Sequence, residues 1–483
     1  MRNISGAILT GANVSRIQPA RPLSSLTGLT GTFFGGAVPL PSEPKLSVPV
    51  RSLPAAPGGS AGLDLGLRTD WLGLSALLCV SLFVAFVSVR LSTYRHYWLD
   101  QYMGPAMEMV RTGHIQYDFL PVLYPALLAE GYKLFGSEEG VTAVNIALSL
   151  LMLASCWMFL RLSGLRPALT LVVVSALSLY PDFALSYDKT QDTSITALAI
   201  FAFLSALIFL IKEKNRPWLP DILAGATLGF AVLVRTNMMT LGLASIFVLH
   251  RLGAGRLLRR ALLQASAASA ASAIYCLATL LIHGSVFFPR NGSYNLFAGY
   301  NQFTSAHLWN EEDSIGDACN ADHLACANDR DPRLDHFYRT AAINFIRQNP
   351  GQAGKLFFLK FGYMMSPDLH LHPFDTLAGK AKVLESFGIP LWVIVSFFFW
   401  NGLRSFDTRP LIASVLVAVI TPFCLMISTH RFRVPLDFLC WSDLGATALL
   451  ALGEWRKKKA LHPSGEPSPG PSTVDQEGSS FAD

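Results

Sequence analysis

The sequence predicts an all-helical membrane protein with about ten transmembrane helices, external helices lying in the membrane interface, and one external segment of intermediate size. Three observations lead to this fold class. Of the 483 residues, 51% are hydrophobic and only 15% are charged, whereas charged residues make up roughly a quarter of an average soluble domain. The apolar residues gather in blocks long enough for a helix to cross the hydrocarbon core. The basic residues lie in short loops between those blocks.

The chain begins with a stretch that has no helical periodicity. Residues 1–69 are rich in Gly, Pro, Ser and Thr, as in "GGAVPLPSEPKLSVPVRSLPAAPGGSAG". Such a composition buries too little apolar surface to fold, so it predicts a disordered tail in the cytoplasm. The run "LTGTFFGGAVPL" is interrupted by glycines and does not resemble a secretory signal. The same reasoning predicts a second disordered cytoplasmic tail over residues 456–483.

Between the tails, a transmembrane domain is expected over residues 70–455. Its predicted spans are residues 71–91, 141–160, 167–181, 192–211, 219–234, 238–250, 261–282, 384–402, 410–428 and 434–453. With the N-terminus in the cytoplasm, every strongly basic short loop is internal, as the positive-inside rule requires. These internal residues are Arg161, Arg166, Lys212, Lys214, Arg216, Arg251, Arg256, Arg259, Arg260, Arg404, Arg409, Arg456, Lys457, Lys458 and Lys459. The sequence thus predicts a multi-pass protein of the cell (inner) membrane with both termini cytoplasmic.

The opposite side receives two larger external segments, residues 92–140 and 284–380. In the first, Tyr102, Ala106 and Met109 recur at helical spacing while polar residues lie elsewhere, which predicts a helix in the membrane interface. Asp100 lies just before this helix, where a carboxylate suits capping and catalysis alike. The second segment contains Cys319 and Cys326, which an oxidising compartment would allow to form a disulfide; two unpaired thiols are the alternative.

Three more external clusters have residues suited to chemistry. "YPDFALSYDKTQDTS" places Asp182, Asp188, Lys189 and Asp192 at the outer ends of two spans, where ionisable groups indicate a functional site. For each acid the alternative is that it caps the following helix or lies in water. Arg235 ends a span whose small residues suit tight packing against another helix. "HRFRVP" places His430, Arg431 and Arg433 between the last two spans. Outer arginines suit a phosphate-bearing ligand through charge-assisted hydrogen bonds, or else snorkel to lipid headgroups.

The remaining cysteines and motifs exclude several classes of site. Cys79, Cys156, Cys276, Cys424 and Cys440 fall in or beside apolar blocks without metal-ligand spacing, which is typical of small core residues. No Walker loop, dinucleotide glycine motif, zincin helix or nucleophile elbow is present in the sequence. The sequence therefore predicts no bound nucleotide or other cofactor and leaves the presence of a divalent metal open. The excess of positive charge forms no single basic face, so nucleic acid is not expected as a partner.

Taken together, the motifs resemble the GT-C superfamily of polytopic glycosyltransferases, in particular bacterial relatives of protein O-mannosyltransferases and aminoarabinose transferases. The stretches that carry the resemblance are "WLDQYMGPAMEMVRTG", "YPALLAEGYKLFG", "GATLGFAVLVRTN" and "HRFRVPLDF", with a weaker match in "AAINFIRQNPGQAGKLFFLKFGYMMSP". They are distributed over residues 71–455. Many members carry an Asp-Glu pair in the first external loop, whereas Gln101 follows Asp100 here. The resemblance therefore implies neither a second acid at that position nor a metal held by such a pair.

The resemblance implies a membrane glycosyltransferase that moves a hexose or pentose from a polyprenyl-phosphate donor to an extracytoplasmic lipid, glycan or protein. It maps the catalytic base onto Asp100. One of Asp182, Asp188 and Asp192 is expected to be a supporting acid. Asp182, Lys189, Arg235, His430 and Arg433 are expected to contact the substrates. A transporter or lipid flippase is the rival class; such proteins commonly carry internal repeats, and none is seen. A non-catalytic assembly subunit is a third class.

Overall fold

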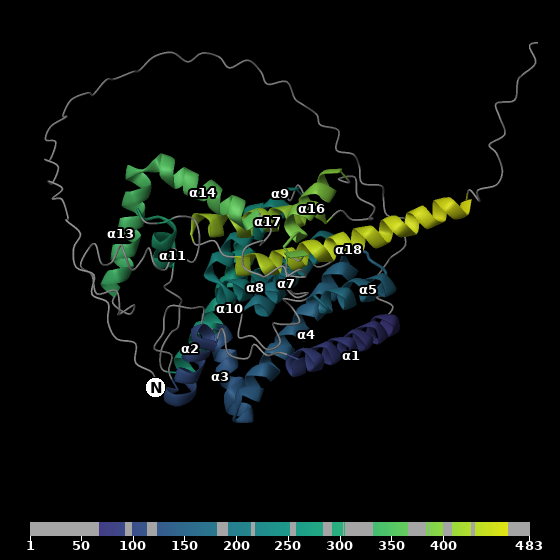
Figure 1. The fold of residues 1–483 in the computed structure, drawn as a ribbon, viewed down its shortest axis with the longest axis horizontal. Coiled ribbons are helices and arrows are strands. Elements are labelled where there is room, and N and C mark those ends of the chain that lie inside the picture. The colour runs from purple at the N-terminus through teal and green to yellow at the C-terminus, as the bar shows by residue number, and fades with distance from the viewer. Residues whose placement is uncertain are drawn as a thin grey trace, which may run out of the picture. The chain divides into compact units, whose positions relative to one another are not determined.

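The computed structural model describes the central part of the chain with several gaps. The described residues are 67–91, 99–113, 123–180, 192–213, 218–251, 257–283, 292–302, 304, 332–365, 383–384, 386–398, 408–426 and 430–461. Both ends of the chain lie outside these ranges, and so do most of the two predicted tails. All regular structure in the described residues is helical (Figure 1), which confirms the predicted fold class.

The helices follow the predicted spans closely. Their bounds are α1 Leu67–Leu91, α2 Leu99–Thr112, α3 Leu123–Phe135, α4 Glu138–Leu162, α5 Pro167–Ser178, α7 Thr193–Lys212, α8 Trp218–Val234, the 3-10 helix η1 Thr236–Thr240, α9 Leu241–Arg251, α10 Leu257–His283, α11 Gly292–Gly299, α13 Pro332–Gln348, α14 Pro350–Met365, α16 Gly388–Phe398, α17 Arg409–Leu425 and α18 His430–Leu461. α18 continues through Leu461, beyond the predicted boundary at residue 455.

Four of the described helices are long and apolar enough to cross a membrane, namely those covering Glu139–Leu162, Thr193–Lys212, Leu257–Leu281 and Arg433–Lys457. Six shorter apolar helices, of 10–17 residues, lie at the other predicted spans. A helix needs about 20 residues to cross the hydrocarbon core. The chain is therefore a multi-pass membrane protein, and the count of ten spans stays a prediction.

The core of the described part is built from neighbouring helices that pack in sequence order. α2 packs on α3, α3 on α4, α4 on α7, α7 on α8 and α8 on α10, while α18 joins the bundle against α5, α7 and α16. The α8–α10 contact is very close because Gly225 and Gly229 face Gln264, Ala267 and Ala268, where an added Cβ would collide. This confirms the expectation that the small residues of α8 allow tight helix packing.

Two interactions between helix ends define one end of this bundle. Lys212, the last residue of α7, donates a hydrogen bond to the carbonyl oxygen of Leu162, the last residue of α4. Arg260 near the start of α10 pairs with Asp221 near the start of α8, with Nε and Oδ2 2.8 Å apart. The helix ends beside the predicted internal loops are therefore in contact, α4 with α7 and α8 with α10. Because α7 has 20 residues, its other end lies about 30 Å away.

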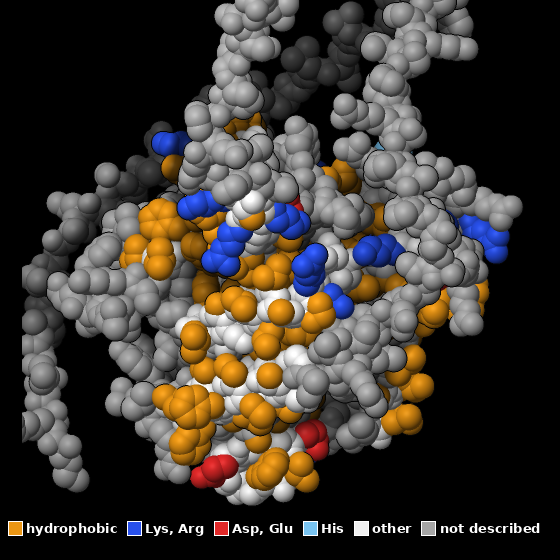
Figure 2. Space-filling model, turned by 90° about the vertical axis from the view of Figure 1, so that its right-hand side faces the viewer, with side chains coloured by type: hydrophobic (Ala, Val, Ile, Leu, Met, Phe, Trp, Pro, Cys, Tyr) orange, Lys and Arg blue, Asp and Glu red, His pale blue; other side chains and the backbone are white. Residues whose placement is uncertain are grey.

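One face of the molecule shows how charge is distributed over the described surface. In Figure 2, Lys and Arg side chains gather in a band, hydrophobic side chains cover much of the surface below the band, and a few Asp and Glu side chains lie at the lower edge. Large exposed apolar residues such as Phe83, Phe86 and Leu281, with exposed fractions of 67%, 59% and 76%, are expected where lipid replaces water as the solvent. Three of the five cysteines predicted to be core residues are buried, namely Cys156, Cys424 and Cys440. Cys276 is partly exposed and Cys79 is exposed.

Candidate functional site

A buried ion pair joins two of the residues that the sequence analysis singled out. Asp192 precedes the first residue of α7, and Arg235 follows the last residue of α8, so α7–α8 packing brings the two together. Nη2 of Arg235 lies 2.6 Å from Oδ1 and 2.5 Å from Oδ2 of Asp192. Both residues are less than 10% exposed. The pair lies at the end of α7 opposite to Lys212, and hence opposite to the basic loops.

The carboxylate of Asp192 contacts an arginine and does not cap its own helix. Asp192 occupies the N-cap position of α7, yet its side chain makes no capping hydrogen bond. Its backbone carbonyl instead accepts the hydrogen bond from the amide of Thr196. Helix capping was the alternative explanation for this acid. The structure shows that its carboxylate binds Arg235.

α2 reaches this ion pair through Tyr102. The guanidinium of Arg235 donates a hydrogen bond to Tyr102, and both Asp192 and Tyr102 favour the charged arginine. Burial lowers the pKa of Arg235, but the charges of Asp192 and Tyr102 and the hydrogen bonds to them outweigh it, so the pKa is raised. Tyr102, Ala106 and Met109 are all buried, which confirms the predicted apolar face of this helix.

Tyr102 in turn packs on a second tyrosine. The rings of Tyr102 and Tyr124 meet edge to face, with centroids 5.1 Å apart. The Tyr124 hydroxyl donates a 2.8 Å hydrogen bond to Oδ1 of Asn145 in α4. Burial, followed by the charges of Asp192 and Tyr102, raises the pKa of Tyr124 well above its usual value. Residues from α2, α3, α4, α7 and the end of α8 therefore meet in one buried polar cluster.

The proposed base lies next to this cluster in the chain. The sequence analysis placed Asp100 just before the helix. In the structure α2 begins at Leu99, so Asp100 lies in its first turn. A carboxylate in a first turn is still favoured by the helix dipole. Asp100 precedes Tyr102 by two residues, which places its backbone in the same helical turn as the residue that contacts Arg235.

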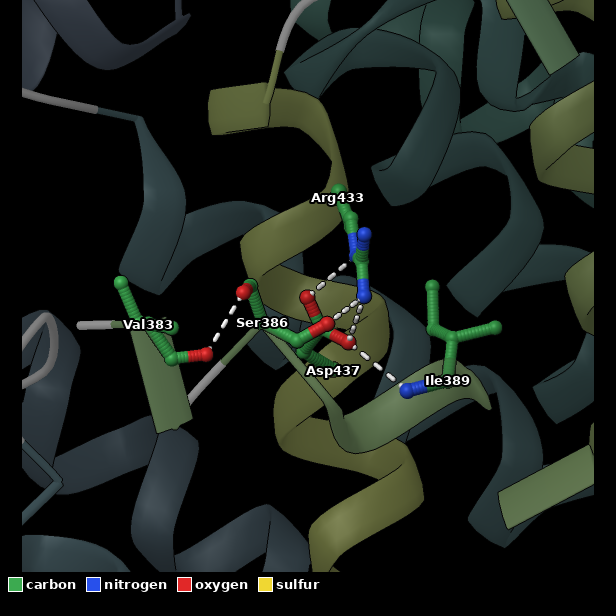
Figure 3. A network of polar contacts seen from close by, with 5 residues as sticks. All are labelled: Val383, Ser386, Ile389, Arg433 and Asp437. Atoms are coloured by element: carbon green, nitrogen blue, oxygen red, sulfur yellow. Dashed lines mark hydrogen bonds and ion pairs between the residues drawn. The ribbon is translucent and has the colours of Figure 1, made fainter. Parts of the chain in front are cut away.

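Arg433 belongs to a different network, shown in Figure 3. Its Nε lies 2.7 Å from Oδ2 of Asp437, one turn later in α18, and its Nη2 donates to the carbonyl oxygen of Ser386. Oδ1 of Asp437 also accepts a 2.8 Å hydrogen bond from the amide of Ile389 at the start of α16. Arg433 has an exposed fraction of 1%. Together with Asp437 it binds α18 to α16 and to the residue Ser386 that precedes α16. His430 is the first residue of the same helix.

The structure thus brings Asp192 and Arg235 together and places the α2 turn that contains Asp100 beside them. Arg433 and His430 belong to α18 instead. The other predicted site residues, Asp182, Asp188 and Lys189, lie outside the described residues, as do Cys319 and Cys326. Among the described residues, no group of three or more His, Cys, Asp or Glu side chains could hold a metal ion.

Sequence reasoning missed several members of these networks. The pairing of Arg433 with Asp437 had a local signal, because residues four apart are neighbours on a helix. Tyr124 and Asn145 had no such signal, since an apolar face and an uncharged amide are ordinary in a packed helix. Lys360 also escaped notice, although it is a single cation in the apolar run "KLFFLKFGYMM" and its side chain is fully buried.

Comparison with known proteins gives three findings. The family model of the dolichyl-phosphate-mannose-protein mannosyltransferases matches residues 120–283. No curated protein matches. Among solved structures, the chain is similar to ArnT from Cupriavidus metallidurans bound to undecaprenyl phosphate, with 13% identity, a TM-score of 0.38, and coverage of 82% of this chain and 81% of that chain. At this TM-score no position is transferred between the two.

The matched region contains Tyr124, Asn145, Asp192 and Arg235, which are four members of the buried polar cluster. It also includes the Gly-rich span and the entry to the interfacial helix, two of the stretches on which the sequence resemblance depended. The match therefore confirms the resemblance of this chain to the GT-C superfamily of membrane glycosyltransferases.

Proposed function

We propose that this protein transfers a hexose or pentose from a polyprenyl-phosphate carrier to a lipid, glycan or protein acceptor outside the cytoplasm. The observation that carries the proposal is the buried Asp192–Arg235 pair, to which Tyr102 joins the helix that contains Asp100. Support for the lipid-phosphate donor comes from the matched family, whose name specifies a dolichyl-phosphate sugar. A lipid-linked donor also requires no soluble nucleotide-binding domain.

Arg235 is the proposed phosphate contact. When the glycosidic bond to the phosphate breaks, negative charge develops on the leaving phosphate, and a fixed cation nearby stabilises it. Asp192 holds the guanidinium of Arg235 in one orientation, which reduces the reorganisation needed during the reaction. In this role Asp192 is a supporting acid that positions Arg235 and takes no proton itself. Asp188 is a second proposed supporting acid. Further proposed contacts with the donor or the acceptor are Asp182, Lys189, His430 and Arg433.

Asp100 is the proposed general base. The acceptor hydroxyl attacks the anomeric carbon, the bond from that carbon to the phosphate oxygen breaks, and the hydroxyl proton passes to the Asp100 carboxylate. This single displacement inverts the configuration at the anomeric carbon. A carboxylate held near a cationic phosphate site in a partly dry environment is suited to this role, which commonly contributes a factor of about a hundred to ten thousand to the rate.

The proposed orientation places the cluster on the outer side of the inner membrane and the basic loops in the cytoplasm. Supporting it are the pairing of the loop ends at Lys212 and Arg260 and the location of Asp192 at the far end of α7. Both termini are then cytoplasmic, as the positive-inside rule predicts.

A transfer assay with purified protein tests this function. The protein, in detergent, is incubated with a radiolabelled polyprenyl-phosphate sugar and with membrane extract as a source of acceptors. Appearance of label in acceptor material, with release of the free lipid phosphate, supports the proposal. A flippase would instead move the labelled lipid across the bilayer of proteoliposomes and leave its glycosidic bond intact, and that result would contradict it.

A further inference from the structure

The two halves of α14 expose different kinds of side chain. In the N-terminal half, the polar residues Gln352 and Lys355 are exposed. In the C-terminal half, Phe358, Leu359 and Phe361 are exposed, with 71%, 47% and 42% of their surfaces accessible. Three large apolar side chains on one stretch of helix form a patch that water does not favour.

The buried residues of α14 change along the helix in the same way. Ala353 and Leu356 in the first half form a small cluster with Tyr300, within the segment predicted to be external. Met364 near the end belongs instead to the main core cluster, which is formed by the apolar helices of the bundle. Met365 also packs against that core. α14 therefore runs from the external segment toward the membrane-spanning bundle.

Lys360 fixes which face of α14 is buried. Its fully buried ammonium group donates to the carbonyl oxygens of Gly299, at 2.7 Å, and Met426, at 2.6 Å. It also lies 4.1 Å from the centroid of the Tyr300 ring. Gly299 ends α11 and Met426 is the C-cap of α17, so the ammonium binds the negative ends of two helix dipoles.

Rotation of α14 would therefore remove a buried charge from its acceptors, which is costly. Consequently the patch of Phe358, Leu359 and Phe361 stays on the outside of the protein. The contact of Lys360 with Met426 also gives the depth of this patch relative to the membrane. Met426 follows the last residue of α17, a predicted span, so Lys360 lies at the level where that span ends. Lys355 lies about 7.5 Å earlier along the axis of α14.

We infer that α14 enters the lipid bilayer: its C-terminal half, from Phe358 onward, lies among the acyl chains of the adjacent leaflet, with Lys355 at the headgroups. In the orientation proposed above this is the outer leaflet. The partner is bulk phospholipid. The apolar side chains that follow Lys355 in α14 then contact hydrocarbon, while the Lys355 ammonium reaches the polar interface. Part of the segment at residues 284–380 would thus be embedded in the membrane.

Fluorescence quenching in nanodiscs tests this inference without any measure of transferase activity, so it is independent of the proposed reaction. Gln352 and Leu359 are a matched pair, because seven residues separate them by two turns on one face and about 10 Å of axial rise. Each is replaced in turn in the full-length protein by the fluorescent residue acridonylalanine. Quenching is measured with a phospholipid that has a nitroxide on its acyl chain and with a water-soluble nitroxide.

The expected result is that Leu359→acridonylalanine is quenched at least threefold more by the lipid nitroxide than by the aqueous one, and that Gln352→acridonylalanine shows the reverse order. Phe358→acridonylalanine, which replaces one aromatic side chain with another, repeats the test if the Leu359 variant does not fold. Aqueous quenching at both sites would overturn the inference, and so would shielding of Leu359 from both quenchers by a protein partner. Equal lipid quenching at residues 352 and 359 would also contradict it, because that result describes a helix lying flat in the interface.

Discussion

Arg235 and Asp192 lie 2.5 Å apart at the end of the helix bundle opposite to the basic loops, although 43 residues separate them in the chain. The pair joins the end of α8 to the start of α7, and the contact of Arg235 with Tyr102 adds α2 to the junction. The same ion pair is therefore important for folding and for the proposed chemistry. Substitutions within it separate these two roles.

Asp192→Asn should destabilise the protein strongly. The amide cannot balance the buried guanidinium charge, and breaking a buried ion pair from one side commonly costs about 3 to 5 kcal/mol. Replacement of both partners, Asp192→Leu with Arg235→Met, leaves no charge without its partner and should recover part of that loss. Thermal unfolding in detergent is the measurement. If the double variant is no more stable than Asp192→Asn, burial of an unbalanced charge is not the cause of the lost stability.

The stability of the folded protein should fall at high pH because of Tyr124. Its pKa is raised in the folded protein by burial and by the neighbouring Asp192 and Tyr102. The folded state therefore holds the phenolic proton at a pH where the unfolded chain releases it. Stability is retained below the usual tyrosine pKa of about 10 and falls above it, by up to about 1.4 kcal/mol per pH unit.

Tyr124→Phe removes this proton, so its stability should fall less steeply above pH 10 than that of the wild type. Tyr132→Phe, on the same helix but half-buried, is the matched control. Unfolding measured between pH 8 and pH 11 compares the three proteins. The explanation fails if Tyr124→Phe and the wild type lose stability in parallel.

Reporter fusions should locate the loops. The pairing of Lys212 with Leu162 and of Arg260 with Asp221 places these helix ends together, and the positive-inside rule assigns them to the cytoplasm. A reporter fused after Arg260 should therefore be cytoplasmic and one fused near Asn320 external. Both reporters on the same side would contradict the assignment of spans between them.

Cys319 and Cys326 should resist thiol labelling in intact cells until a reductant is added. Both belong to the predicted external segment, where an oxidising compartment favours a disulfide. Cys276, which lies in α10, is a control that addition of the reductant should not affect, since it is a free thiol. Labelling of residues 319 and 326 without reductant would show that the two thiols are not paired.

Much of the fold could be predicted because a lipid environment makes the signal one of length and hydropathy. Apolar runs located the helices. The periodicity of α2 placed Tyr102, Ala106 and Met109 on one apolar face, and the structure shows that this face is buried. The small residues of α8 indicated its close neighbour. The number of spans stays a prediction, because helices such as α5 and α16 have only 12 and 11 residues, whereas a helix needs about 20 to cross the hydrocarbon core.

The candidate site was harder to predict because its contacts are between segments far apart in the chain. The sequence indicated that Asp192 and Arg235 lie on one side of the membrane, but only the packing of α7 on α8 makes them partners. Arg433 shows the opposite case, since its partner Asp437 is one helical turn away. Lys360 gave no signal either, because the contacts of its ammonium group with two helix-end carbonyl oxygens and an aromatic ring come from segments far apart in the chain.

The transfer rate of Asp100→Asn tests directly whether Asp100 is the general base. The substitution is nearly isosteric and keeps an oxygen that can cap the first turn of α2, so a purely structural role should cost only about 1 kcal/mol of stability. Loss of a general base should lower the rate by a factor of about a hundred to ten thousand, because the amide cannot accept the proton. Glu108→Gln makes the same acid-to-amide change on the same helix and is the control.

Wild type and both variants are compared at equal amounts of monodisperse protein in detergent, with a synthetic polyprenyl-phosphate sugar as donor and membrane extract as acceptor. Asp100→Asn should lose at least about a hundredfold in transfer rate while its thermal unfolding stays close to that of the wild type. Glu108→Gln should keep its activity. Transfer by Asp100→Asn within about threefold of the wild-type rate, which is less than the usual effect of losing a catalytic base, would show that Asp100 does not take the proton.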